Sequence, residues 1–180
     1  NFPEAYFILI EALPLFEDSC TSILKKIAGE YHIKAVSNYA GQKSFSLGTS
    51  ALSRAGFSID SMAQTGEISQ DVEITTLDLL LGDRLLERDL LLKMDLQGHD
   101  LLAAKGGEKI LNTSDMVIFE ASFFNTNNMV KDIIAYMDAK GFQLYEVFGM
   151  LFRPYDNAAG QCDLAFVPRD SYLVAHPRWA

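Results

Sequence analysis

The sequence predicts an α/β fold in which a mostly parallel sheet ends in an antiparallel pair of strands. Short apolar segments alternate with segments whose apolar residues recur every three or four positions, a pattern typical of strands that alternate with helices. The last two apolar segments, Phe142–Phe152 and Cys162–Val167, have no helix between them and therefore predict an antiparallel pair. A chain of 180 residues fits one domain, residues 1–180.

The N-terminal part predicts two strands that flank a helix. The first strand, Tyr6–Ile10, ends at Glu11. A helix is expected over Pro14–Ala28, because proline suits the first helical turn and the apolar residues that follow have helical spacing. Gly29 is the expected helix stop, and Ile33–Tyr39 is the second strand candidate.

The following part, Gly41–Gln70, is rich in Ser, Gly, Thr and Ala and has no sustained hydrophobic period. We interpret it as an irregular excursion with a short strand at Ser44–Leu47. A loop of this length in a compact domain is usually functional or mobile. A strand at Val72–Thr75 and a short helix at Thr76–Leu86 are expected next, and Asp78 is expected to cap or tether this helix.

The run Leu90–Gly98, LLLKMDLQG, is the most informative segment of the chain. Its continuous apolar residues predict a strand that is buried on both faces, and Asp95 leaves the sheet where this strand ends. Open α/β sheets bind ligands beyond the carboxyl ends of their strands, so Asp95 is the first candidate for a direct role. The alternative is that Asp95 caps the next helix, His99–Leu111, which Gly106 and Gly107 weaken.

A second acid follows a strand further along the chain. The apolar segment Met116–Phe119 predicts a strand that ends at Glu120. The apolar stripe that begins at Met129 predicts a helix that ends at Gly141. Because parallel strands meet at one edge of a sheet, Glu120 is expected to face the same crevice as Asp95.

Two groups of side chains are expected mainly in the core. Cys20 and Cys162 lie in apolar patterns, and two cysteines are too few to imply a disulfide framework. The aromatic residues of Phe123–Phe124 and Phe142–Phe152 are also expected in the core, and a few of them are candidates to line a ligand pocket.

The charge and the hydropathy pattern exclude several function classes. The net charge of −9 argues against nucleic acid and against an anionic membrane surface as partners. No apolar run approaches the ~20 residues that span a bilayer, and no signal-peptide pattern opens the chain. The expected location is therefore the cytoplasm.

Several segments together resemble one family, the FkbM methyltransferases. The segments are TTLDLL at Thr75–Leu80, LLKMDLQGHDLLAAKGG at Leu91–Gly107, MVIFEAS at Met116–Ser122, AYMDAKGFQLYEV at Ala135–Val147, QCDLAFVPRD at Gln161–Asp170 and FILIEALPLF at Phe7–Phe16. The resemblance covers about Phe7–Ser171. It implies a Rossmann-like class I methyltransferase fold and methyl transfer from S-adenosyl-L-methionine, with O-methylation of a small molecule or sugar hydroxyl as the expected reaction. It is also compatible with a homodimer.

The chain departs from the family pattern at its start. The family's Asp-x-Gly-x-Asn-x-Gly turn, which cradles the methionine part of the cofactor, does not occur in this sequence. The chain begins at Asn1 and runs almost directly into a strand, so we expect the N-terminal strand and the Gly-rich turn to be missing from it. Two alternatives stay open: a catalytically inactive methyltransferase-like binding or scaffold module, and a nucleotide-linked Rossmann-like enzyme of another class.

The resemblance also implies a cofactor-binding group. Glu11, at the end of its strand, would accept hydrogen bonds from the ribose hydroxyls, and the segment Asn38–Ala40, which includes Tyr39 and Ala40, would lie against the adenine. Asp95 would contact the sulfonium-bearing amino acid or the substrate. The alternatives are a solvated acid for Glu11 and a core position for Tyr39.

The expected catalytic group consists of Asp95, His99 and Glu120. Histidine titrates near neutral pH, so His99 could take a proton from a hydroxyl, although a surface histidine is equally compatible with the sequence. The alternative for Glu120 is an ion pair with Lys93. Oxygen ligands suit Mg²⁺, so the three could also hold a divalent cation, but our prediction includes no metal. His99 stands where the family commonly has a small residue, and Asp100 where it commonly has Glu.

Overall fold

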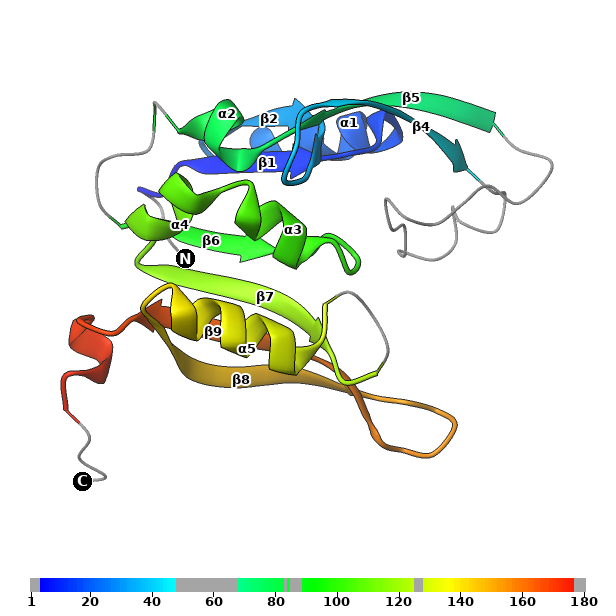
Figure 1. Ribbon diagram of the computed structural model, residues 1–180. Helices are drawn as coiled ribbons and strands as arrows, with labels where there is room; N and C mark the ends of the chain where they lie inside the picture. The colour runs from blue at the N-terminus through cyan, green and yellow to red at the C-terminus, as the bar shows by residue number, and fades with distance from the viewer. Residues whose placement is uncertain (1–3, 48–67, 83, 85–88, 125–127, 177–180) are drawn as a thin grey trace.

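The computed structural model describes residues 4–47, 68–82, 84, 89–124 and 128–176, and these residues form three sheets (Figure 1). In the first sheet, β1 (Phe7–Glu11) and β2 (Gly29–Ile33) are parallel. In the second sheet, β5 (Ile68–Thr75) lies between β3 (Ala35–Val36) and β4 (Gly41–Leu47), parallel to β3 and antiparallel to β4.

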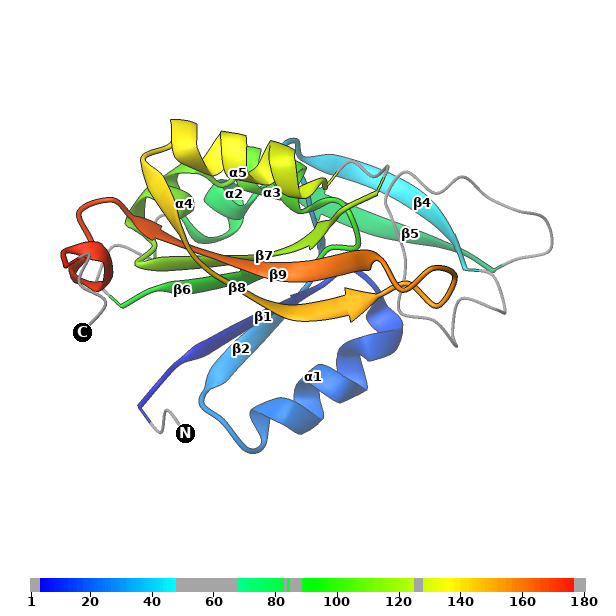
Figure 2. The same cartoon turned by 90° about the horizontal axis from the view of Figure 1, so that it is seen from below.

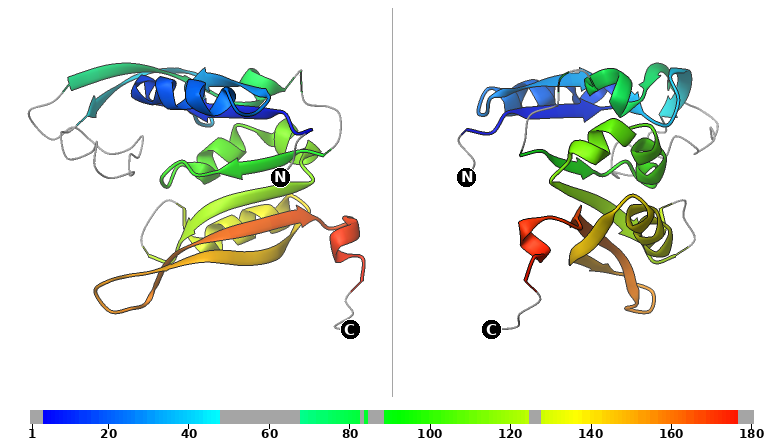
Figure 3. Two further views of the ribbon diagram at one scale, coloured as in Figure 1. Left: turned by 180° about the vertical axis from the view of Figure 1, so that it is seen from behind. Right: turned by 60° about the vertical axis from the view of Figure 1, so that its left-hand side comes forward.

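The third sheet has the strand order β6-β7-β9-β8. Its strands are β6 (Leu91–Met94), β7 (Met116–Ser122), β8 (Phe142–Phe152) and β9 (Ala159–Pro168). β6 and β7 are parallel, whereas β9 is antiparallel to both β7 and β8. The predicted antiparallel pair at the C-terminus is therefore confirmed. The β8–β9 hairpin extends past the end of β7 (Figure 3).

The α/β class is confirmed, but the mostly parallel arrangement is not, because the sheets are mixed. The parallel pairs are β1–β2, β3–β5 and β6–β7, and the antiparallel pairs are β4–β5, β7–β9 and β8–β9. A parallel pair requires a long crossover connection. β4 and β5 pair in the antiparallel sense, which the sequence did not predict, and β9 is antiparallel to both of its neighbours.

Helices cover one face of the third sheet (Figure 2). They are α3 (Asp100–Lys105), α4 (Glu108–Thr113) and α5 (Val130–Ala139). α1 (Glu17–Leu24) follows a 3-10 turn at Pro14–Phe16 and packs near β2, and α2 (Leu77–Leu81) packs near α4. A 3-10 turn at Tyr172–Val174 follows β9. Among the described residues, no helix has the length and apolar character needed to cross a membrane.

The core lies between these helices and the sheet. β7 alternates strictly, so Val117, Phe119 and Ala121 are buried while the side chains between them lie on the other face. The rings of Phe119 and Phe166 meet edge to face, with centroids 5.9 Å apart. Cys162 and Cys20 are both buried free cysteines, which confirms their predicted core positions.

The opposite face of the third sheet is open, which corrects two predictions. β6 is not buried on both faces: Leu91 is 58% exposed, whereas Met94 is buried, because helices cover only one side. The aromatic side chains are also more exposed than predicted. Phe142 is buried, but Phe123, Phe124 and most apolar residues of β8 are exposed.

The N-terminal elements are shorter than predicted. α1 ends at Leu24, and the strand expected over Ile33–Tyr39 is divided between β2, which ends at Ile33, and the two-residue β3. Gly29 begins β2 instead of stopping a helix, because a Cβ at this residue would lie 2.2 Å from the Phe7 carbonyl oxygen. A side chain there would prevent the close pairing with β1.

The predicted excursion Gly41–Gln70 is wrong at both ends. β4 begins at Gly41, before the expected short strand, and β5 begins at Ile68, before the expected Val72. The register from Gly41↔Ile74 to Leu47↔Ile68 shows that the two ends of the segment pair with each other. The rest of the predicted excursion, residues 48–67, lies outside the described residues.

The helix predicted over His99–Leu111 is broken into α3 and α4 at its two glycines. A Cβ at Gly106 would lie 2.1 Å from the Ser37 carbonyl oxygen, and one at Gly107 would lie 2.8 Å from the Leu77 side chain. The glycines thus allow this junction to pack against the end of β3 and against α2. Asp78 accepts the Lys109 and Ile110 amides and so ties α2 to the start of α4, whereas the cap of its own helix is Thr76, whose side chain accepts the Leu79 amide.

We expect Gly106→Ala to lower the free energy of unfolding by about 2–3 kcal/mol, because its methyl group would overlap a backbone oxygen that cannot rotate away. The measurement is urea unfolding followed by circular dichroism. The matched control is Gly41→Ala, where the nearest atom to a new Cβ is a Tyr39 ring carbon at 3.7 Å. Equal losses in the two variants would contradict the packing argument.

Candidate functional site

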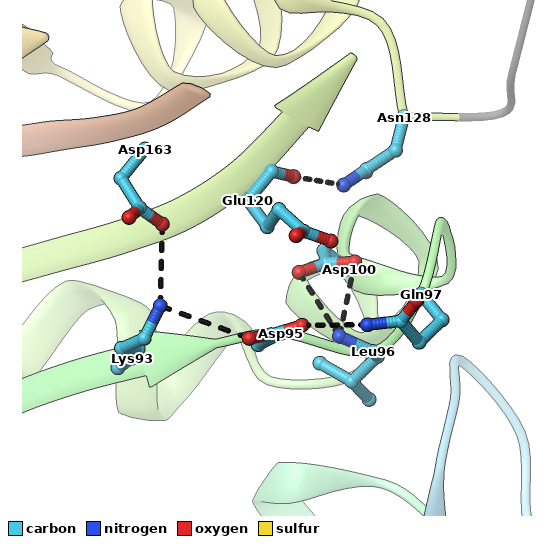
Figure 4. A network of polar contacts seen from close by, with 8 residues as sticks. All are labelled: Lys93, Asp95, Leu96, Gln97, Asp100, Glu120, Asn128 and Asp163. Atoms are coloured by element: carbon cyan, nitrogen blue, oxygen red, sulfur yellow. Dashed lines mark hydrogen bonds and ion pairs between the residues drawn. The ribbon is translucent and has the colours of Figure 1, made fainter. Parts of the chain in front are cut away.

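A small polar hollow lies on the open face of the third sheet, near the carboxyl ends of β6 and β7. Its volume is about 120 Å³, and Lys93, Asp95, Glu120 and Asp163 supply its charged groups (Figure 4). Segments of β8 and β9 close the other side. The structure therefore brings Asp95 and Glu120 to one rim, where the sequence predicted that they would meet.

Lys93 is the positively charged residue among these four. Its Nζ lies 3.2 Å from Asp163 Oδ1 and 3.9 Å from Asp95 Oδ2. The pairing of Lys93 with Glu120, which was the structural alternative for Glu120, is replaced by this pairing with Asp163. Both partners of each pair are partly exposed, so each ion pair contributes only modestly to stability.

Asp95 is presented by a tight turn between β6 and α3. Gln97 and Gly98 have φ angles of 52° and 88°, both in the left-handed region. The Gln97 side chain donates a hydrogen bond to Asp95 Oδ1 at 3.0 Å. Asp95 does not cap α3, because the cap residue of that helix is His99, which makes no side-chain capping bond. The carboxylate of Asp95 instead lines the hollow.

Asp100, at the first position of α3, is the residue of this site that the sequence reasoning missed. Its side chain is fully buried, and both carboxyl oxygens lie 3.3 Å from the Leu96 amide nitrogen. Burial raises the pKa of Asp100 from 3.8 to about 7, and the negative charges of Glu120 and Asp95 add to the rise. The sequence carried two signals for Asp100: it is an acid at the start of a helix that follows a strand-end turn, and it stands where the family commonly has Glu.

Glu120 lies on β7 between the hollow and Asp100. Partial burial raises the pKa of Glu120. The negative charges of Asp95 and Asp163 raise this pKa further, whereas the positive charge of Lys93 lowers it. A carboxylate whose pKa is raised is a stronger proton acceptor than an ordinary surface glutamate.

Asn128 joins the end of β7 to the start of α3. Its Nδ2 donates to the Glu120 carbonyl oxygen, and its Oδ1 accepts the Leu101 amide at 3.1 Å (Figure 4). The side chain is buried, so these bonds are shielded from water. The sequence reasoning did not single out this link, because nothing local to residue 128 indicates which backbone groups it meets.

His99 does not join the hollow. It is 2% exposed, and its Nε2 lies 3.0 Å from Ser37 Oγ, at the end of β3. The prediction that His99 acts beside Asp95 and Glu120 is therefore not supported by its position, and the surface alternative is wrong. Within the described part of the chain, no group of three His, Cys, Asp or Glu side chains is arranged to hold a metal ion.

The predicted cofactor residues of the first strands lie outside the hollow. Glu11 Oε1 accepts the Leu13 amide at 2.9 Å, so this carboxylate also holds the turn after β1. Tyr39 is 46% exposed and Ala40 is exposed, so the core alternative for Tyr39 is wrong. The roles of all three residues in cofactor binding stay predictions.

Comparison with known families decides the family of the chain. The pattern of the methyltransferase FkbM domain matches residues 2–144. The chain belongs to this family. No curated protein and no solved structure gave a significant match. The matched range of this FkbM domain includes Glu11, Asp95, Asp100 and Glu120, whereas Asp163 on β9 lies beyond it.

The buried acid of this FkbM domain predicts a pH-dependent stability. The pKa of Asp100 is 3.8 ordinarily and about 7 in the folded protein, so between these pH values the folded state holds a proton that the unfolded state has lost. The stability that the protonated carboxyl group of Asp100 contributes is fully present below about pH 4, and it is lost as the pH rises through 7.

We expect wild type to lose about 2–4 kcal/mol more unfolding free energy than Asp100→Asn between pH 4 and pH 8. Urea unfolding at intervals of half a pH unit measures the two slopes. Asp115→Asn is the matched control, because Asp115 accepts the Leu90 amide at the other end of β6 and is exposed. Parallel curves for wild type and Asp100→Asn would contradict the role of burial.

Proposed function

We propose that this FkbM domain transfers a methyl group from S-adenosyl-L-methionine to a hydroxyl oxygen of a small molecule or sugar. The family assignment supports methyl transfer, and the observation that carries the site is Glu120, a carboxylate of raised pKa on the rim of the hollow beside Asp95. The parallel β6–β7 pair followed by antiparallel β9 and β8 is compatible with a Rossmann-like class I methyltransferase sheet.

In this proposal the residues of the hollow act on the methyl acceptor. When bound, S-adenosyl-L-methionine supplies an electrophilic methyl group on a sulfonium centre. Glu120 accepts the proton of the acceptor hydroxyl, which raises the nucleophilicity of the oxygen. Asp95 accepts a hydrogen bond from a neighbouring hydroxyl and so orients the acceptor. Lys93 limits the repulsion among the carboxylates of the hollow.

We assign the hollow to the acceptor and not to the nucleoside, and its small size supports this assignment. Its volume of about 120 Å³ is well below the roughly 300–1,000 Å³ of pockets for drug-sized ligands. The described hollow therefore fits a hydroxyl-bearing part of a substrate. The nucleoside is assigned to the region of Glu11, Tyr39 and Ala40, where a carboxylate is chemically suited to the two ribose hydroxyls.

The decisive experiment is a binding measurement on the full-length protein. We expect S-adenosylhomocysteine to raise the melting temperature in a concentration-dependent way, while NAD leaves it unchanged. Radiolabelled methyl transfer to a panel of sugars and small hydroxyl compounds then identifies the acceptor. A protein that binds neither S-adenosylmethionine nor its product would favour the catalytically inactive module.

Two substitutions test the roles of the acids in the hollow. Glu120→Gln should lower kcat by about 10²–10⁴-fold, because an amide cannot accept the hydroxyl proton. Asp95→Asn should lower kcat/KM while the unfolding free energy changes little, since Asp95 is partly exposed. Steady-state methyl transfer is the measurement, and Asp115→Asn is the control of equal charge change. Wild-type turnover in Glu120→Gln would remove the proposed base.

Glu11→Ala should weaken the binding of S-adenosylhomocysteine by about 10–100-fold, the loss expected for hydrogen bonds to a charged group. Isothermal titration calorimetry measures the affinity. Glu11→Gln separates binding from folding, because its side-chain oxygen can still accept the Leu13 amide. If Glu11→Ala binds with wild-type affinity, the ribose role of Glu11 is wrong.

A further inference from the structure

The buried carboxyl group of Asp100 and the rim carboxyl group of Glu120 are neighbours on different elements. Asp100 is the first residue of α3, and Glu120 is on β7 (Figure 4). The negative charge of Glu120 acts on Asp100 from across the gap between the two elements. Asn128 holds this gap closed, because it bonds both the Glu120 carbonyl oxygen and the Leu101 amide.

The charges around this pair do not balance. Asp95 faces the pair from the turn after β6, and Asp163 faces Glu120 from β9. Lys93, on β6, is the base that acts on Glu120, and it is already shared with Asp163 and Asp95. Four ionised carboxylates near one ammonium group would repel one another strongly, so retention of one proton is favourable.

Burial decides which residue retains that proton. Asp100 is fully buried and lines no part of the hollow, whereas Glu120 reaches the rim. Removing a charge from water costs most at the more buried site, so the proton stays on Asp100 and Glu120 ionises first.

We propose that Asp100 is a positioning residue of this site: it holds the proton of a carboxyl pair with Glu120 and, through the Leu96 amide, fixes the turn that presents Asp95. A neutral Asp100 leaves Glu120 as the ionised member, able to accept a proton from a substrate. The catalytic meaning of the pair rests on the proposed function, but its titration does not.

The hydrogen bond from the Leu96 amide gives Asp100 a second role, which is to hold the turn that presents Asp95. Leu96 directly follows Asp95, and the next residues adopt left-handed φ angles, so the amide of Leu96 is the point at which the turn is held to α3. Loss of the Asp100 side chain would release this hold without touching the hollow itself.

The test is a ¹³C NMR titration of the side-chain carboxyl carbons of Glu120 and Asp100 in the full chain. In wild type we expect two inflections at Glu120, its own at the lower pH and a second near pH 7 that reports the ionisation of Asp100. Asp100→Asn should remove the second inflection and keep the first. Glu120→Gln should move the Asp100 titration to lower pH, because it removes a negative neighbour.

Hydrogen exchange checks the positioning role separately. The Leu96 amide should exchange at least about 10-fold faster in Asp100→Ala than in Asp100→Asn, whose side-chain oxygen can still accept it. Asp115→Asn should leave both the Glu120 titration and the Leu96 amide unchanged. If the Asp100 variants do not fold, the wild-type and Glu120→Gln titrations still decide the outcome.

The proposal is overturned if Asp100 titrates like an ordinary aspartate, or if the second inflection at Glu120 persists in Asp100→Asn. Failure of the methyl-transfer assay with a two-step titration would remove the proposed function and leave the carboxyl pair. Methyl transfer together with a one-step titration would support the proposed function and remove the carboxyl pair.

Discussion

The one-sided covering of the third sheet is the constraint on which the site depends. α3, α4 and α5 bury one face, so every second residue of β7 must be apolar, and the residues between them are directed to the open face. Lys93, Glu120 and Asp163 lie on that open face because of this alternation. The polar hollow is therefore a consequence of how the apolar core is packed.

The site combines an open, partly hydrated rim with a dry interior. Asp95 and Glu120 reach the rim, whereas Asp100 and Asn128 are buried behind it. The side chains of Asp100 and Asn128 fix the backbone at the start of α3 and at the end of β7. These two segments present the carboxylates of the rim. A site of this kind keeps its geometry without making the acids on its rim inaccessible to a ligand.

The sequence predicted correctly those features that depend on local patterns of residues. β8 has the predicted bounds, α5 ends before Gly141 as expected, and the positions of Asp95 and Glu120 near neighbouring strand ends followed from the strand pattern. It failed where distant contacts decide. Gly106 and Gly107 divide a helix because of Ser37 and Leu77, which lie far away in the sequence.

Residue type and spacing along the chain are enough to indicate the family, the alternation of strands and helices, and the carboxylates at the ends of two strands. The packing of distant segments was needed to show which face of the third sheet is open, that His99 turns towards Ser37, and that Asp100 lies buried beside Glu120. Burial and charge proximity depend on which segments pack together, and a single sequence does not encode that packing in any local pattern.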